Sequence, residues 1–115
     1  MAATQLPKEF VDKVYEAIEA AKTTGKIKKG SNEVTKAIEK GTAKLVAVAK
    51  DVNPPEITMH IPLLCEEKGI LCVEVLSKEE LGAAAGLEVG TVSVAIVQEG
   101  ESKTLIKMIA EKAGK

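Results

Sequence analysis

Apolar residues recur along much of the chain at the three- and four-residue spacing that gathers side chains on one face of a helix. The longest such pattern runs over residues 7–22, where Pro7 suits the first turn. A second helix is predicted over residues 31–40, with Gly41 at its end, and a last helix over residues 102–112. Each of these helices is expected to bury one face in a shared core.

Short runs rich in valine, leucine and isoleucine predict strands between the helices. Three of them, residues 44–49, 71–75 and 92–97, are apolar enough to be buried on at least one face. Residues 26–28 can add a short edge strand. Because helices and strands alternate, we expect an α/β fold, namely a three-layer α/β/α sandwich around a mixed sheet of about four short strands.

Two further helices are predicted between the strands. Residues 54–69 carry apolar positions at helical spacing, but Pro62 is expected to kink or divide this helix because its nitrogen bears no hydrogen. Ser77 and Glu80 form a capping box at the start of a short helix that Gly86 can end.

The composition fits one compact domain over residues 1–115, since 45% of the residues are hydrophobic and no repeat or linker interrupts the chain. No apolar run approaches the roughly eighteen residues that a membrane span needs. The first residues, MAATQLPKEF, lack the charged and apolar regions of a signal peptide. We therefore expect a cytoplasmic protein without membrane contact.

Residues able to carry out catalysis or to hold a metal are scarce. The chain contains no GxGxxG, phosphate-loop, HExxH or GxSxG motif. Cys65 and Cys72 show neither CxxC spacing nor a nearby ligand cluster, so they are expected to be reduced and buried. His60, the single histidine, is expected to form a structural hydrogen bond from a helix. We therefore expect that the protein is not an enzyme and that it binds no metal or cofactor.

Charge is distributed unevenly, although the whole chain has a net charge of only −1. Residues 22–50 contain eight lysines against Glu33 and Glu39, so acidic residues predominate in the rest. A segregated basic face attracts phosphate, and an acidic remainder discourages indiscriminate binding. All sixteen basic residues are lysine, and aromatic residues make up only 2%, so a platform on which bases stack is not expected.

The most informative cluster begins just before the second predicted helix. Gly30 or Ser31 can begin this helix, whose free backbone N–H groups and positive dipole end form an anion site. Lys28 and Lys29 stand beside that site. A phosphate group can be held there.

One turn further on, Asn32 and Lys36 lie on one face of the helix with Glu33 beside them. A lysine can donate hydrogen bonds to guanine O6 or N7, and a carboxylate can accept them from guanine N–H groups. A sheared G·A pair leaves the Watson–Crick edge of its guanine free for such a carboxylate. The alternative is a solvated helix face on which Glu33 and Lys36 form an ion pair worth about a few tenths of a kcal/mol. The residues by themselves favour neither interpretation.

Several stretches together resemble the L7Ae family of ribosomal proteins, in particular its archaeal members, which bind kink-turn RNA. The resemblance spans residues 7–112 and rests on the stretches GKIKKGSNEVTKAIEKGTAKLV, DVNPPEITMHIPLLCEEKGI and SKEELGAAAGLEVGTVSVAIV and on the closing helix. It implies a non-enzymatic protein, monomeric when free, that stabilises the sharply bent form of structured RNA with tandem sheared G·A pairs. The assemblies implied are the large ribosomal subunit, the box C/D and H/ACA guide particles and ribonuclease P, each with its own protein subunits.

The resemblance also implies which residues contact RNA. The stretch KKGSNEVTK is expected to grip the kink-turn, with phosphates near the first two lysines and the G·A pairs near the helix, through Lys28, Lys29, Gly30, Asn32, Glu33 and Lys36. A later loop is expected to pack against the nucleotide thrown out of the kink, through Leu87, Glu88 and Val89. Ile57 and Lys78 correspond to further contacts.

Some residues allow other interpretations or depart from the family pattern. Leu87 can also be the apolar residue that follows a helix ending at Gly86, and both roles can hold. Asn53 stands where relatives often carry an acid, and Gly90 and Thr91 are expected to loosen the loop. A rival function is a protein-binding scaffold that docks a partner on its acidic surface, and a cryptic enzyme is the least favoured.

Overall fold

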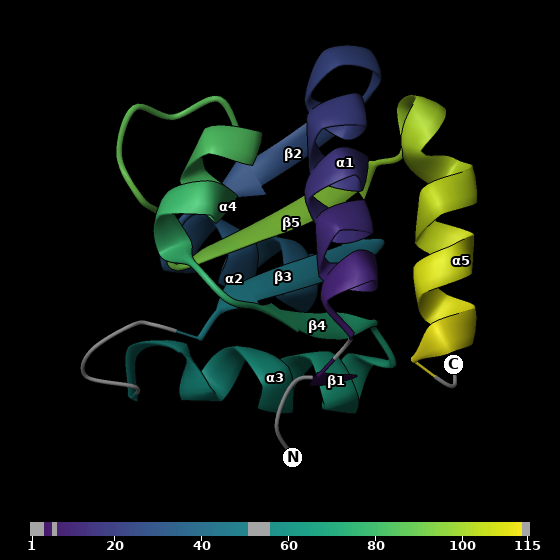
Figure 1. Cartoon of the computed structure of the whole chain (residues 1–115). Helices are drawn as coiled ribbons and strands as arrows, with labels where there is room; N and C mark the ends of the chain where they lie inside the picture. The colour runs from purple at the N-terminus through teal and green to yellow at the C-terminus, as the bar shows by residue number, and fades with distance from the viewer. Residues whose placement is uncertain (1–3, 6, 51–55, 114–115) are drawn as a thin grey trace.

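A computed structural model of the chain describes residues 4–5, 7–50 and 56–113, with side chains over residues 7–50 and 60–113. The chain forms one sheet with helices on both faces (Figure 1). The elements follow one another as β1 (Thr4–Gln5), α1 (Lys8–Thr24), β2 (Lys26–Lys29), α2 (Ser31–Lys40), β3 (Leu45–Ala49), α3 (Glu56–Lys68), β4 (Cys72–Val75), α4 (Lys78–Ala84), β5 (Ser93–Gln98), the 3-10 turn η1 (Gly100–Ser102) and α5 (Lys103–Lys112).

Five strands form a mixed sheet in the order β1-β4-β3-β5-β2. β4 runs parallel to both β1 and β3, whereas β5 runs antiparallel to both β3 and β2. Every residue of the central strand β3 is buried. Its sequence is apolar without interruption because a strand covered on both faces has no solvent side. The four predicted strands are confirmed, whereas β1 was not predicted, because two residues are too few to show a pattern.

The two faces of the sheet carry separate clusters of buried side chains. α1, α4 and α5 pack on one face, where Ile18, Leu81 and Ile109 are buried. α2 and α3 pack on the other face, where Ile38 and Ile61 are buried. The side chains of β3 alternate between the clusters, with Leu45, Ala47 and Ala49 in the first and Val46 and Val48 in the second. The predicted three-layer α/β/α sandwich is therefore confirmed (Figure 1).

Three helices end in the same way, with a glycine in a left-handed conformation. φ is 73° at Gly41, 69° at Gly69 and 82° at Gly86. After α4, the Gly86 N–H donates to the carbonyl of Ala83, and the Leu87 N–H donates to that of Gly82. This pair of hydrogen bonds is the Schellman motif, which satisfies the last carbonyls of a helix. The ends predicted at Gly41 and Gly86 are confirmed.

α3 differs from its prediction, because it runs without a break from Glu56 to Lys68 through Pro62. Proline removes one hydrogen bond from a helix interior. The residues around it compensate, since Ile61 and Cys65 are buried against the sheet and α2. Burial of one helix face stabilises a helix more than local propensity does, so the helix is not divided at Pro62. The kink, which was the other expectation, stays a prediction.

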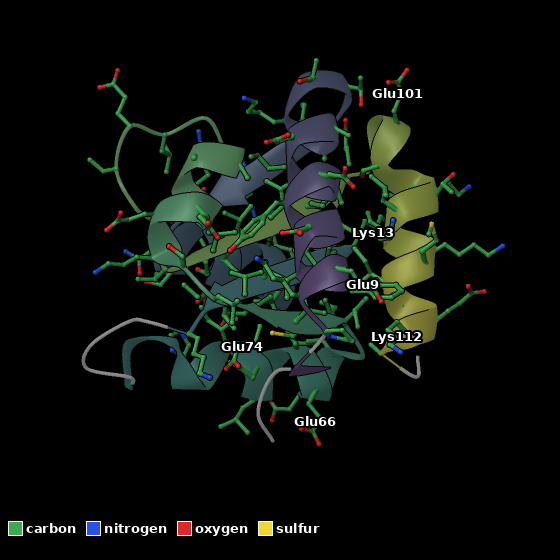
Figure 2. The ribbon with its side chains drawn as sticks, in the orientation of Figure 1. Glu9, Lys13, Glu66, Glu74, Glu101 and Lys112 are labelled. Atoms are coloured by element: carbon green, nitrogen blue, oxygen red, sulfur yellow. The ribbon has the colours of Figure 1, made fainter. Side chains whose placement is uncertain are left out.

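α5 is attached to α1 near both of its ends. Before its start, the Glu101 N–H donates a hydrogen bond of 2.8 Å to Thr24 Oγ1. At its end, Lys112 Nζ lies 5.6 Å from the centre of the Phe10 ring, a cation–π contact. Figure 2 labels Glu101 and Lys112 at the two ends of this helix. α5 begins at Lys103, one residue later than predicted, because η1 occupies residues up to Ser102.

Candidate nucleic-acid interface

The strand directions gather several chain segments at one edge of the sheet, at the left of Figure 1. The parallel strands β3 and β4 end there at Ala49 and Val75, which are partners in register. β5 begins at the same edge at Ser93, and β2 ends there at Lys29. The starts of α2 and α4 therefore lie along this edge, together with the loop of residues 86–92. We call it the site edge.

A single carbonyl group joins the start of α2 to this loop. The Gly30 N–H donates to the carbonyl oxygen of Ser93 at 3.0 Å. Thr91 Oγ1 donates to the same oxygen at 3.2 Å. Two segments that lie about sixty residues apart in the sequence are thus held side by side. This brings together the two groups of predicted site residues.

The backbone at Gly30 turns the chain from β2 into α2. Its backbone angles, φ of 88° and ψ of 154°, lie in a region that residues other than glycine rarely adopt. The Gly30 carbonyl accepts the first hydrogen bond of the helix from the Val34 N–H, at 3.0 Å. No described side chain caps this helix. Its first N–H groups can therefore receive an anion from outside, as predicted from the sequence.

The polar face of α2 is open at this end. Asn32, Glu33 and Lys36 are exposed, whereas Val34 and Ile38 are buried on the opposite face. Within the described residues, the side chains of Asn32, Glu33 and Lys36 form no hydrogen bond or ion pair with one another or with other groups. The alternative of a Glu33–Lys36 ion pair is therefore not observed. An amide, a carboxylate and an ammonium group stand free at one helix start.

Lys28 and Lys29 lie on opposite faces of the sheet, because neighbouring residues of a strand point to opposite sides. Lys28 lines a hollow between β2 and α2, together with Glu33 and Lys36. Lys29 shares the other face with Ile27, which packs against the cluster under α1 and α4. The sequence placed both lysines beside the start of α2, and the structure divides them between its two sides.

The loop of residues 86–92 presents one apolar side chain to solvent. Val89 is 71% exposed, the largest exposed fraction among the large hydrophobic residues described. Leu87, two residues earlier, packs against the core cluster. The interpretation of Leu87 as the apolar residue after a Schellman motif is therefore confirmed. Glu88 between them is exposed.

This loop is held tightly against α4. A Cβ placed on Gly82 would overlap the Val89 carbonyl oxygen, so only glycine allows this approach. The Thr91 N–H donates to the Lys78 carbonyl at 3.0 Å. A Cβ on Gly90 would lie 3.1 Å from Lys78 Cγ. Gly90 and Thr91 therefore lie against the first turn of α4, and the expectation that they loosen the loop stays a prediction.

The remaining predicted contacts lie at or near the site edge. Lys78 is exposed in the first turn of α4. Ile57 belongs to the first turn of α3, but its side chain lies outside the described residues, as does Asn53 altogether. Leu76 was missed: it follows β4 at the site edge and is 51% exposed. The only signal in the sequence was an apolar residue directly before the cap residue Ser77.

The histidine and the two cysteines, which were expected to have structural roles, lie as predicted. His60 Nε2 lies 3.1 Å from Thr35 Oγ1, a hydrogen bond that joins α3 to α2. Cys65 and Cys72 are free and buried. Hydrogen bonding between the two thiols lowers the pKa of Cys65, and with burial it raises the pKa of Cys72. Both pKa shifts arise because the packing of α3 on β4 brings the two thiols together.

Metal-binding clusters and membrane-spanning helices are both absent from the part of the chain that the structure describes. No group of three or more His, Cys, Asp or Glu residues there is arranged to hold a metal ion. None of the helices described is both long enough and apolar enough to span a bilayer.

Comparison with known proteins relates this chain to one protein family and to solved structures. The family model described as "Ribosomal protein L7Ae/L30e/S12e/Gadd45 family" matches residues 12–106. A solved structure of the Giardia lamblia 15.5kD RNA binding protein is similar to this chain, with a TM-score of 0.89 and 31% sequence identity. The match covers 95% of this chain and 91% of the Giardia chain. The archaeal character implied by the sequence stays a prediction. The chain belongs to the Ribosomal protein L7Ae/L30e/S12e/Gadd45 family.

Proposed function

We propose that this protein binds kink-turn RNA along the site edge and stabilises its bent form. One observation carries the proposal: the shared Ser93 carbonyl holds the open start of α2 beside the loop that presents Val89. A polar surface able to read base edges thereby lies next to an exposed apolar group. The similarity to an RNA binding protein over nearly the whole chain supports this assignment.

The start of α2 is the proposed reading surface for the tandem sheared G·A pairs. Glu33 accepts hydrogen bonds from guanine N–H groups, and Lys36 donates to guanine O6 or N7. Asn32 can both donate and accept, so it bridges neighbouring base edges. These groups can bind RNA without first breaking an internal ion pair among the described residues.

Val89 is the proposed contact for the nucleotide that leaves the stack at the kink. Its exposed methyl groups can cover the face of a base, and burying apolar surface on both partners favours binding. Leu87 supports the loop from below through its contact with the core. Glu88 lies in the same loop and is proposed to contact the same nucleotide, and Ile57 is proposed as a further apolar contact.

Lysines on both sides of the α2 start are proposed to bind phosphates. Lys28 lies on the α2 face of the sheet and Lys29 on the α4 face. Lys78 adds a third ammonium group from the first turn of α4. Together with the uncapped N–H groups after Gly30, they surround the base-reading surface with positive charge. Such contacts orient RNA without reading its sequence.

A preformed surface of this kind acts by selecting one RNA conformation. Free RNA samples bent and extended forms, and a ligand that binds the bent form more tightly shifts the population toward it. Two fixed segments, the start of α2 and the loop, must contact the RNA at the same time. Only a kinked RNA presents its G·A pairs and an extruded nucleotide together. The protein therefore acts as a clamp.

The protein is not an enzyme, because it belongs to a family of ribosomal proteins and resembles a solved RNA binding protein. We propose that it serves the large ribosomal subunit, the box C/D and H/ACA guide particles and ribonuclease P. Its protein partners are then the other subunits of those particles. The protein would be cytoplasmic, and monomeric when free.

A gel-shift titration tests the proposed function. One RNA carries a kink-turn, and its control has Watson–Crick pairs in place of the tandem G·A pairs, at the same salt concentration. Tight binding to the kink-turn alone is expected. Equal affinity for both RNAs, or no binding to either, would overturn the proposal and leave the protein-binding scaffold as the alternative.

A further inference from the structure

The two cysteines of the chain, Cys65 and Cys72, meet between α3 and the sheet, at the bottom of Figure 1. Both thiols are free, and the two residues are 1% and 7% exposed, respectively. Cys72 is the first residue of β4, and this strand runs from there to the site edge. The cysteine pair therefore lies at the far end of β4 from the proposed RNA interface, and none of the contacts assigned above involves it.

The turn between α3 and β4 folds the chain back so that the strand begins close to the end of the helix. Gly69 has a left-handed φ of 69°. Its N–H donates to the Glu66 carbonyl at 3.3 Å, and the Ile70 N–H donates to the Cys65 carbonyl at 2.8 Å. These hydrogen bonds form a Schellman motif whose last acceptor is Cys65 itself. The backbone on both sides of the pair is therefore fixed by the same turn.

The alternation of side chains along β4 directs Cys72 toward α3. Leu71 and Val73, its neighbours, belong to the core cluster under α1 and α4. Cys72 therefore points to the opposite face of the sheet, into the cluster that α2 and α3 cover. On α3, Ile61 and Cys65 are four residues apart and are buried in that same cluster. One thiol from the helix and one from the strand thus face each other within a single packed layer.

Contact between the two thiols favours their oxidation as a pair. A hydrogen bond from Cys72 lowers the pKa of the Cys65 thiol, and the thiolate is the form that attacks an oxidant. Burial excludes bulky reagents, but the slight exposure of Cys72 gives a small molecule access to the two sulfur atoms. A sulfenic acid formed beside a thiol condenses with it to a disulfide. The second cysteine is already in place for that step.

We propose that Cys65 and Cys72 are an oxidisable pair, which a small hydroperoxide such as hydrogen peroxide converts into a disulfide between α3 and β4. The Cys65 thiolate attacks one peroxide oxygen and breaks the O–O bond, which gives a sulfenic acid and a hydroxide that takes up a proton. The Cys72 sulfur then bonds to the Cys65 sulfur, and the sulfenic hydroxyl group leaves with the Cys72 proton as water. Two thiols are oxidised, and one hydrogen peroxide is reduced to two waters.

The disulfide fastens the end of α3 to the sheet by closing the loop of residues 65–72. A crosslink of this kind stabilises a protein mainly by restricting the unfolded chain. The melting temperature of the oxidised protein is expected to rise by about 5 to 10 °C. Reduction with dithiothreitol should return it to the original value.

The test treats folded wild-type protein with hydrogen peroxide and then alkylates the remaining thiols in denaturant. Intact mass counts the alkylated thiols, and a non-reducing gel separates monomers from crosslinked dimers. The matched controls are Cys65→Ala and Cys72→Ala, each of which keeps one thiol. Methionine oxidation adds oxygen, so it does not imitate the loss of two hydrogen atoms that marks a disulfide.

Both wild-type thiols are expected to disappear together in monomeric protein, with the mass falling by two hydrogen atoms. Neither single variant should give this product. The rate should not change with urea below the unfolding transition, because the thiols already meet in the folded state.

Three outcomes would overturn the proposal. The first is the absence of an intramolecular disulfide in folded wild-type protein, including the case in which only dimers form. The second is an oxidation rate that rises with urea in proportion to the unfolded population, since the reaction would then need unfolding. The third is an oxidised protein that melts below the reduced one, because thiols that face each other in the native fold form their bond without such distortion.

Discussion

Gly30 donates its backbone N–H to the carbonyl of Ser93 at 3.0 Å, and this hydrogen bond places the start of α2 at the first residue of β5. The carbonyl also accepts from Thr91, so a single acceptor positions both proposed RNA-binding segments. Ser93 itself is completely buried. The geometry of the site edge therefore depends on the interior of the sheet and not on the exposed residues alone.

Gly30→Ala is expected to weaken RNA binding by distorting this junction. Its φ of 88° with ψ of 154° strains any other residue by about 1 to 3 kcal/mol, even though no atom lies near a new Cβ. The free energy of unfolding is measured in urea, and affinity by gel shift. Gly41→Ala is the matched control, because it adds a methyl group at positive φ in open space at the other end of α2.

Gly41→Ala should lower stability by about 1 kcal/mol while leaving RNA affinity unchanged among folded molecules. Loss of RNA affinity in both variants to the same extent would indicate that stability alone causes it. That result would remove Gly30 from the binding surface.

Glu33→Ala and Asn32→Ala are each expected to weaken binding to a kink-turn by about 1 to 3 kcal/mol and to relax the preference for G·A pairs. The loss arises because base-edge groups then have no partner. Glu39→Ala is the control, as it removes an exposed carboxylate from the same helix outside the hollow. An equal loss on a duplex with Watson–Crick pairs would contradict the base-reading role.

Val89→Ser is expected to reduce affinity by about 1 kcal/mol, or roughly fivefold, with no change in stability. The reason is that Val89 is already exposed to water in the free protein, so the substitution costs nothing until RNA covers it. Leu87→Ser should instead lower the free energy of unfolding, since Leu87 packs on the core. Unchanged affinity of Val89→Ser would exclude Val89 as an RNA contact.

Tyr15 is expected to ionise at unusually high pH. Burial, together with the nearby charge of Glu80, raises the pKa of Tyr15 to about 12 from its ordinary value of 10.0. Because the folded pKa lies above the unfolded value, the stabilisation is complete below about pH 10 and is lost as the pH rises through about 12. The chain has one tyrosine and no tryptophan, so tyrosinate absorbance reports this group directly.

Denatured protein in guanidinium chloride supplies the reference titration for Tyr15. Glu80→Gln is the second control: it removes the acidic charge and should lower the folded pKa of Tyr15 only in part, because burial is the larger cause. Coincident titrations of folded and denatured protein would refute the buried environment of this hydroxyl group.

Local patterns in the sequence determined most elements and several of their ends. Helical spacing located α1, α2 and α5, and the glycines at positions 41 and 86 marked where α2 and α4 end. Ser77 was identified as a cap, and its Oγ accepts the Glu80 N–H at 3.3 Å. These features were predictable because each depends on residues within one or two turns of each other.

Only the tertiary structure decided how distant segments meet. It placed β1 beside β4, carried α3 through Pro62 and directed Lys28 and Lys29 to opposite faces of the sheet. It also joined the start of α2 to the loop before β5 and left Leu76 exposed at the site edge. The sequence alone determined the residue types of the proposed site and the order of the elements. Their proximity depends on strand pairing and on burial, which are properties of the whole chain and have no local signal.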